Sequence, residues 1–124
     1  MSGFELQTPE VGFSATAAAG AGIVVIRGSL DHSIHDLAVD FFDQVFASFG
    51  PNLIVDLSGL DLLDSRGTGL IVTCWKRAVG QGGRLALVGA EHGATRILWI
   101  TGLTTRIPTF LTVEDALAAL PSHP

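Results

Sequence analysis

Hydrophobic and polar residues along this chain follow two spacings, one typical of strands and one typical of helices. Runs of branched apolar residues predict strands within 11–26, 53–57, 84–88 and 106–110. The small-residue stretch ATAAAGAG divides the first run, which therefore indicates a hairpin of two strands. Pro108 has no backbone N–H for a sheet ladder, so it places the last run at a sheet edge.

Apolar residues three or four positions apart predict four helices between and after these strands. In the first helix, Ser33 is the predicted N-cap with Asp36 at the capping-box position, and Gly50-Pro51 ends the helix. Its predicted inward face consists of Ile34, Leu37, Ala38, Phe41, Val45 and Phe49.

The other three helices have equally clear sequence boundaries. Ser65 is the predicted N-cap of the second helix, which Gly80–Gly83 ends, and its predicted inward face is Leu70, Ile71, Cys74 and Ala78. A short helix is expected at 94–101, followed by Gly102. Thr112 caps the last helix with Asp115 at the capping-box position, and the inward residues there are Ala116, Leu117 and Leu120.

Strands that alternate with helices predict an α/β domain with a mixed, mostly parallel sheet of four to five strands packed with about four helices. A length of 124 residues is enough for one domain with its own core. We expect this domain to span residues 10–120, with 1–9 and 121–124 as loose termini because they carry proline and polar residues without periodicity.

Composition and charge narrow the classes of protein. The net charge is −5 and no basic cluster occurs, which argues against nucleic acid as a partner. The apolar runs are far shorter than the roughly 20 residues that span a bilayer, so no membrane segment is expected. The single cysteine and an N-terminus without a secretory signal favour a cytoplasmic protein.

The segment LIVDLSGLDLLDSRGTGLIV carries the most informative chemistry, because a buried strand there leads through a polar turn into a helix. As an N-cap, Ser65 presents its hydroxyl beside unpaired N–H groups, and Gly67 and Gly69 leave those groups unshielded. A phosphate on Ser65 adds about −1.5 to −2 charges where the helix dipole tolerates them. The simpler interpretation is that Ser65 only caps a helix.

Several stretches together resemble STAS domains, in particular bacterial anti-sigma-factor antagonists. They are GSLD at 28–31, IVDLSGLDLLDSRGTGL at 54–70, GGRLALVG at 82–89, RILWITGL at 96–103 and TVEDALAAL at 112–120. The resemblance covers roughly residues 21–120, and its most specific part is the strand, the Asp-Ser pair and the glycines that follow.

The resemblance implies a binding protein that takes part in transcription regulation and stress response, not an enzyme, and one without a cofactor. In its dephosphorylated state it binds an anti-sigma factor that is also a serine kinase, which frees a sigma factor. Phosphorylation by that kinase ends the binding, and a serine phosphatase reverses it. The phosphorylated serine corresponds to Ser65, with Asp64 before it and Asp31 near the partner. The implied partner-binding residues are Asp31, Asp64, Ser65, Arg66, Gly67 and Thr68.

Two of these positions depart from the family pattern, in which a small hydroxyl residue follows the phosphorylated serine and an aliphatic one follows the first glycine. Here Arg66 and Thr68 stand there. Either Arg66 pairs with a phosphate on Ser65 and lessens its repulsion, or it selects a more acidic partner. Thr68 is a second candidate hydroxyl, or an ordinary residue of the first helical turn.

Other functions have weaker support in the sequence. His32 and His35 lack a third soft ligand, so no metal site is expected. A STAS module that senses a nucleotide or another anion at 65–69, or one that acts in a partner-switching pathway without a sigma factor, remains an alternative. A hydrolase that uses Ser65 or Cys74 requires a general base that the sequence does not reveal.

Overall fold

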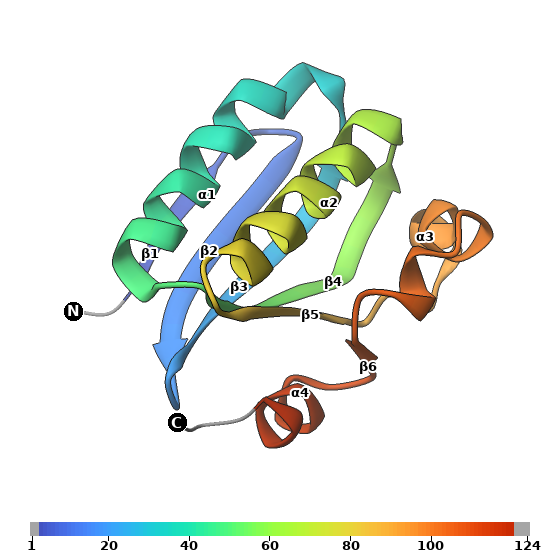
Figure 1. The fold of residues 1–124 in the computed structure, drawn as a ribbon. Coiled ribbons are helices and arrows are strands. Elements are labelled where there is room, and N and C mark those ends of the chain that lie inside the picture. Colours follow the sequence, from blue (N-terminus) through green and yellow to red (C-terminus); the bar gives the residue numbers. More distant parts are fainter. Residues whose placement is uncertain (1–2, 121–124) are drawn as a thin grey trace.

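Six strands form one mixed sheet in the computed structural model, which describes residues 3–120 (Figure 1). Neighbours are antiparallel from β1 to β3 and parallel from β3 to β6, which confirms the mixed, mostly parallel sheet. The sheet has one strand more than the upper end of the prediction. In chain order the strands are β1 (Gly3–Gln7), β2 (Val11–Ala18), β3 (Ala21–Leu30), β4 (Asn52–Leu63), β5 (Arg84–Val88) and β6 (Thr109–Phe110).

The additional strand is β1, and it corrects the expectation that residues 1–9 form a loose end. Residues 3–7 pair with 12–16 of β2, and the Phe4 ring lies 5.2 Å from that of Phe41 and 5.8 Å from that of Phe49. Only Phe4 and Leu6 are apolar in GFELQ, so β1 does not stand out in the sequence, and it is the tertiary contact with aromatic residues that stabilises it. The expected loose end at 121–124 lies outside the described residues.

The predicted hairpin is confirmed as β2 and β3. Its turn consists of Ala19 and Gly20, whose φ angles are 50° and 84°. A two-residue turn with positive φ at both positions matches the right-handed twist of the strands that it joins.

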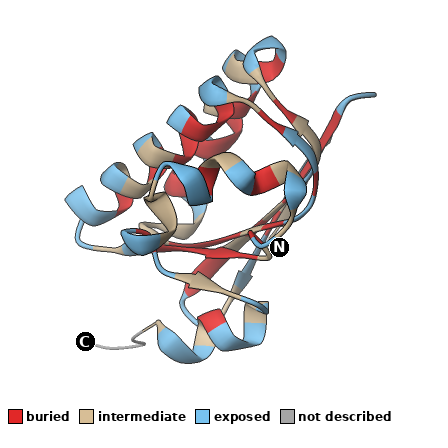
Figure 2. Cartoon of the chain, turned by 90° about the vertical axis from the view of Figure 1, so that its right-hand side faces the viewer, coloured by how far each residue is buried: buried red, intermediate tan, exposed pale blue. Residues whose placement is uncertain are grey.

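Four α-helices flank the sheet, as predicted (Figure 1). Helices α1 and α2 cover one face and bury the larger core, whereas α4 packs on the opposite face over a smaller cluster that contains Ile54, Ala86, Val88 and Ala116. Figure 2 shows the buried residues between these layers. The helices are α1 (His35–Phe49), α2 (Ser65–Gly80), α3 (Arg96–Ile100) and α4 (Val113–Ala119), and short 3-10 turns occur at His32–Ile34, Gly93–Thr95 and Leu103–Thr105.

The inward face of α2 is confirmed, since its four predicted residues are buried. The inward face of α1 differs from the prediction, because Leu37 is exposed while Phe42 and Phe46 are buried. Helix α1 packs on α2 as well as on the sheet, which widens its buried stripe. The guanidinium of Arg77 on α2 lies 4.2 Å from the centre of the Phe46 ring.

The start of α1 also corrects the sequence prediction. Asp31, and not Ser33, provides the cap, because its Oδ1 accepts hydrogen bonds from Ser33 N at 3.0 Å and from Ser33 Oγ at 2.6 Å. A 3-10 turn separates this cap from α1. At α4 the predicted Thr112 cap is confirmed, as Thr112 Oγ1 accepts a hydrogen bond from Asp115 N at 3.1 Å.

Candidate functional site

The candidate site lies where β3 and β4 end side by side. These strands are parallel, and Leu30 at the end of β3 is paired with Leu63 at the end of β4. The loops that follow are therefore neighbours, and Asp64 N donates to Leu30 O at 3.4 Å. This arrangement brings Asp31 and the Asp64-Ser65 pair to the same edge of the sheet.

Asp64 is the N-cap of α2, which corrects the expectation that Ser65 would cap this helix. Its Oδ1 accepts a hydrogen bond from Gly67 N at 2.8 Å, and its Oδ2 accepts one from His32 N at 3.0 Å. Aspartate and serine are both effective caps in general, but of Asp64 and Ser65 only Asp64 has the extended backbone that a cap requires. Ser65 is consequently the first residue inside the helix.

The carboxyl group of Asp64 is held in its ionised form. Partial desolvation raises the pKa of this carboxyl group. The hydrogen bonds from the N–H groups of Gly67 and His32, together with the His32 ring, whose Nδ1 lies 3.4 Å away, lower it by more. The net result is a pKa below the ordinary value of 3.8. The start of α2 thus already has a negatively charged group in the position where helices bind anions.

Gly67 is required for the close contact between α2 and the end of β3. A Cβ atom on Gly67 would lie 2.3 Å from the Leu30 carbonyl oxygen. Because Gly67 is buried and its N–H is bonded to Asp64, it positions the site and does not offer that N–H to a partner. The expectation of an unshielded N–H is therefore corrected at this residue.

Thr68 is also a structural residue, which revises its role as a second candidate hydroxyl. It is only 7% exposed, and its Oγ1 donates to Asp64 O at 2.9 Å. A hydroxyl that is buried and bonded to the preceding turn is not accessible to a kinase.

Ser65 and Arg66 are the exposed residues of this turn. Within residues 3–120 the Ser65 hydroxyl has no hydrogen-bond partner, so its oxygen is available to an approaching protein. One turn further along α2, Gly69 is exposed too, and a Cβ atom there would meet nothing within 4 Å. The fold would accommodate a side chain at Gly69. Because none is present, the exposed face of the first two turns of α2 is open at this position.

Asp31 lies beside this turn but is partly engaged. It is half-buried, and its Oδ1 holds the loop after β3 through Ser33. Asp31 and Asp64 therefore lie on the adjacent loops that follow β3 and β4. Sequence reasoning missed the role of His32, because the group that bonds to Asp64 is a backbone N–H, which every residue except proline carries.

Cys74 does not have the properties of a nucleophile. It is buried on α2, and burial raises the pKa of its thiol to about 12, while the nearby Arg77 lowers it only in part. A thiol with this pKa is protonated at neutral pH, which removes the hydrolase alternative based on Cys74. His32 and His35 belong to no cluster of three or more metal-binding side chains in the part of the chain that the structure describes.

Comparison with known proteins gives the family. The model of the STAS domain matches residues 13–116, so the chain belongs to the STAS domain family. An anti-sigma F factor antagonist of Paenibacillus polymyxa is 26% identical over 102 residues, which are 80% of this chain and 87% of that protein.

Solved structures agree in fold. An anti-sigma factor antagonist from Mycobacterium paratuberculosis superimposes with a TM-score of 0.76 and 25% identity, over 93% of this chain and 98% of that one. An anti-sigma-factor antagonist (STAS) domain protein from Planctomyces limnophilus gives a TM-score of 0.74 at 21% identity, over 86% of this chain and 96% of that one. Within residues 3–120 no helix is both long and apolar enough to cross a membrane.

Proposed function

We propose that this chain is an anti-sigma-factor antagonist whose binding is switched by phosphorylation of Ser65. In the dephosphorylated state it binds an anti-sigma factor with serine-kinase activity and so releases a sigma factor in the cytoplasm. Phosphate on Ser65 ends the binding, and a serine phosphatase restores it. The similarity to the Paenibacillus polymyxa antagonist over most of both chains supports this assignment.

The exposed hydroxyl of Ser65 is the observation that carries the proposal. It is presented on a turn that Asp64 and Gly67 hold in place through hydrogen bonding and close packing. Thr68, the other hydroxyl of the turn, is buried. Only one side chain of this turn therefore combines a hydroxyl with accessibility.

The charge of a phosphate explains how modification can act on the partner without unfolding the domain. About −1.5 to −2 charges at the start of α2 lie near the positive end of the helix dipole, so the domain tolerates them. At an interface, however, the phosphate carries its hydration and charge into contact with the partner and stands beside Asp64. A cost of a few kcal/mol is enough, since each 1.4 kcal/mol changes affinity about tenfold.

The structure disfavours the alternative of an anion sensor at residues 65–69. The Asp64 carboxylate accepts hydrogen bonds from Gly67 N and His32 N, so these two N–H groups are not free for an anionic ligand. A partner-switching pathway without a sigma factor would use the same exposed Ser65. The identity of the protein that binds this chain distinguishes such a pathway from a sigma-factor pathway.

The proposal is tested with purified anti-sigma factors of the serine-kinase class from the same organism, each incubated with ATP and this chain. We expect one of them to transfer phosphate to Ser65, which mass spectrometry of the peptide locates. Ser65→Ala should abolish the transfer but retain binding, and Ser65→Asp should weaken binding. Thr68→Ser, which keeps a hydroxyl at the buried position, is the control and should behave as the unaltered chain does. Phosphate transfer to Ser65→Ala at an undiminished rate would show that the site is wrong.

A further inference from the structure

The His32 side chain lies against the Asp64 carboxylate, at the turn that carries Ser65. Its ring Nδ1 is 3.4 Å from Asp64 Oδ2, and the backbone N–H of the same histidine donates to that oxygen at 3.0 Å. The His32 side chain is 76% exposed, whereas that of Asp64 is 30% exposed. The loop after β3 therefore places an accessible imidazole beside the residue that directly precedes Ser65.

Only one of the two ring nitrogens of His32 is used in this contact. A carboxylate accepts hydrogen bonds and does not donate them, so the contact with Asp64 requires the proton on Nδ1. Within residues 3–120, Nε2 has no hydrogen-bond partner, and it points away from Nδ1 across the ring. Because consecutive Cα atoms are about 3.8 Å apart, a phosphate that extends the exposed Ser65 side chain comes within reach of that nitrogen.

Positive charge is scarce in the sequence around this turn. Between Arg27 and Arg66 the chain contains neither lysine nor arginine. His32 and His35 are therefore the only residues of the loop after β3 and of α1 whose side chains can become cationic. On α2 the first cationic side chain is Arg66, which adjoins Ser65 in the chain.

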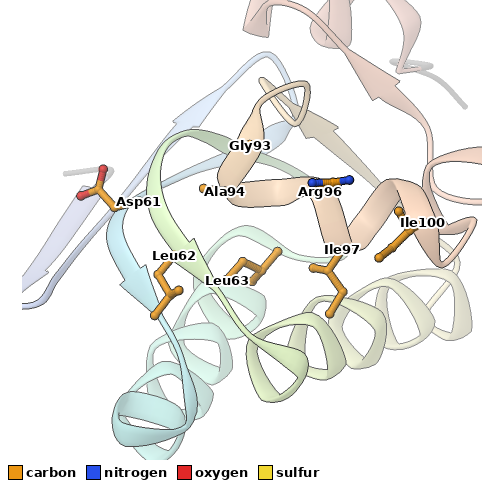
Figure 3. A pocket seen from close by; sticks show the side chains of 8 residues that line it. All are labelled: Asp61, Leu62, Leu63, Gly93, Ala94, Arg96, Ile97 and Ile100. Atoms are coloured by element: carbon orange, nitrogen blue, oxygen red, sulfur yellow. The ribbon is translucent and has the colours of Figure 1, made fainter.

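Helix α3 contributes a further arginine near the end of β4. Figure 3 shows Arg96 on the α3 side of an open pocket, with Leu63, the residue before Asp64, on the β4 side. The rest of the pocket wall is mainly aliphatic and includes Leu62, Ile97 and Ile100. Arg96 is thus separated from the end of β4 by this pocket, whereas His32 contacts the Asp64 carboxylate itself.

We propose that the His32 imidazole binds the phosphate on Ser65 in the phosphorylated chain, with Nδ1 donating to Asp64 and Nε2 donating to a phosphate oxygen. This inference rests on the proposed function and assigns a phosphate-binding residue to its phosphorylated state. The ring takes up a proton from solvent because two anions then flank it. Its positive charge offsets the repulsion between the phosphate and Asp64, so the turn keeps its geometry after modification.

Other charged groups on the surrounding elements are Asp31 on the same loop, Asp36 on α1 and Arg66 on α2. Asp31 Oδ1 is already bonded to the backbone and hydroxyl of Ser33. Arg66 is the competing cation, because it can reach the phosphate from the same helical turn. The test therefore has to separate the contribution of His32 from that of Arg66.

The pairing is measurable because both groups change charge near neutral pH. The second pKa of a phosphoserine is about 6, and histidine side chains in general change charge between about pH 5 and pH 8. A nearby cation favours the doubly charged phosphate and lowers the phosphate pKa, whereas a nearby carboxylate raises it. Removal of the His32 ring should consequently raise the phosphate pKa.

The test uses the full chain with phosphoserine incorporated in place of Ser65 during translation, so that no kinase is needed. Phosphorus NMR between about pH 5 and pH 8 measures the phosphate pKa. His32→Gln, which keeps the backbone N–H to Asp64, should raise this pKa by about 0.5 or more, and His32→Lys should restore the lower value. His35→Gln is the matched control and should leave the phosphate pKa unchanged, since His35 has no hydrogen bond or ion pair with Asp64 in the described range 3–120.

The outcomes separate this inference from the proposed function. If His32→Gln leaves the phosphate pKa unchanged, or if only Arg66→Ser raises it, the assignment of His32 is wrong, and phosphate transfer to Ser65 by an anti-sigma factor would still support the proposed function. If His32→Lys raises the phosphate pKa as much as His32→Gln does, the effect does not come from positive charge and the assignment is again wrong. If no such kinase modifies Ser65, the proposed function fails independently of the NMR result.

Discussion

The Asp64 carboxylate accepts a hydrogen bond from the backbone N–H of His32 at 3.0 Å, across 32 positions of the sequence. The same carboxylate caps α2 through Gly67. One side chain thereby joins the loop after β3 to the first turn of the helix that presents Ser65. The position of Ser65, the proposed phosphorylation site, depends on these two hydrogen bonds of Asp64.

Replacement of Asp64 should destabilise the protein without affecting its core. Asp64→Ala removes the cap and leaves the His32 N–H without its acceptor, so we expect a loss of about 1–2 kcal/mol in the free energy of unfolding. Asp64→Asn retains an oxygen acceptor and should lose less. Urea unfolding of both variants measures the difference, and equal losses would contradict the role of the cap.

The lowered pKa of Asp64 predicts a dependence of stability on pH. Because the pKa is lower in the folded than in the unfolded state, the ionised carboxyl contributes stability at pH values above its ordinary pKa of 3.8. This contribution should be lost as the pH falls through the folded-state value. Unfolding experiments from neutral to acidic pH should therefore show a smaller loss for Asp64→Asn than for the unaltered chain, and parallel curves would refute the assignment.

The two glycines of the turn should respond in opposite ways to alanine. Gly67→Ala brings a Cβ atom against the Leu30 carbonyl oxygen and should destabilise the protein by about 1–3 kcal/mol. Gly69→Ala meets no neighbour within 4 Å and should stabilise the helix by about 0.5–1 kcal/mol. Thermal unfolding of the pair provides the test, and each variant is the other's control.

Gly69→Ala also tests the docking surface on α2. If the partner approaches the helix closely beside Ser65, the added methyl group should weaken binding although the protein itself is more stable. Calorimetric titration with the cognate anti-sigma factor measures this effect. Unchanged affinity would place the partner away from this turn.

Arg66 should lessen the effect of phosphorylation, because its exposed guanidinium is next to Ser65 and can pair with a phosphate. Arg66→Ser is therefore expected to leave the affinity of the dephosphorylated chain unchanged and to increase the loss of affinity on phosphorylation. Arg106→Ser, which removes another exposed arginine, is the control. A loss of affinity in the dephosphorylated state would show instead that Arg66 contacts an acidic group of the partner.

Cys74 should resist alkylation in the folded protein. Its thiol is buried and has a pKa of about 12, so little thiolate forms at pH 8. Mass spectrometry after iodoacetamide treatment should show modification in urea but almost none in native buffer. Rapid modification of the folded chain would contradict both the burial and the raised pKa.

Much of the fold followed from local patterns. The run at 84–88 predicted β5, the run at 53–57 predicted only the first part of β4, which continues to Leu63, and the apolar spacing of α2 predicted its buried face. These predictions succeeded because a buried strand and a helix with one buried face repeat their apolar residues at fixed intervals. Strand β1 was missed, because it depends on Phe4 packing against aromatic residues more than thirty positions away.

In the candidate site, too, some features were predicted from the sequence and others were not. The sequence by itself identified Asp64-Ser65 at a strand-to-helix junction and the glycines after it, because turn chemistry is local. Only the tertiary structure decided that Asp64 is the cap, that Thr68 is buried and that Gly67 supports the packing. It also placed Ile97 and Ile100 beside Leu62. Those outcomes depend on which backbone groups and side chains meet when β3, β4 and α3 assemble, and sequence spacing does not contain that information.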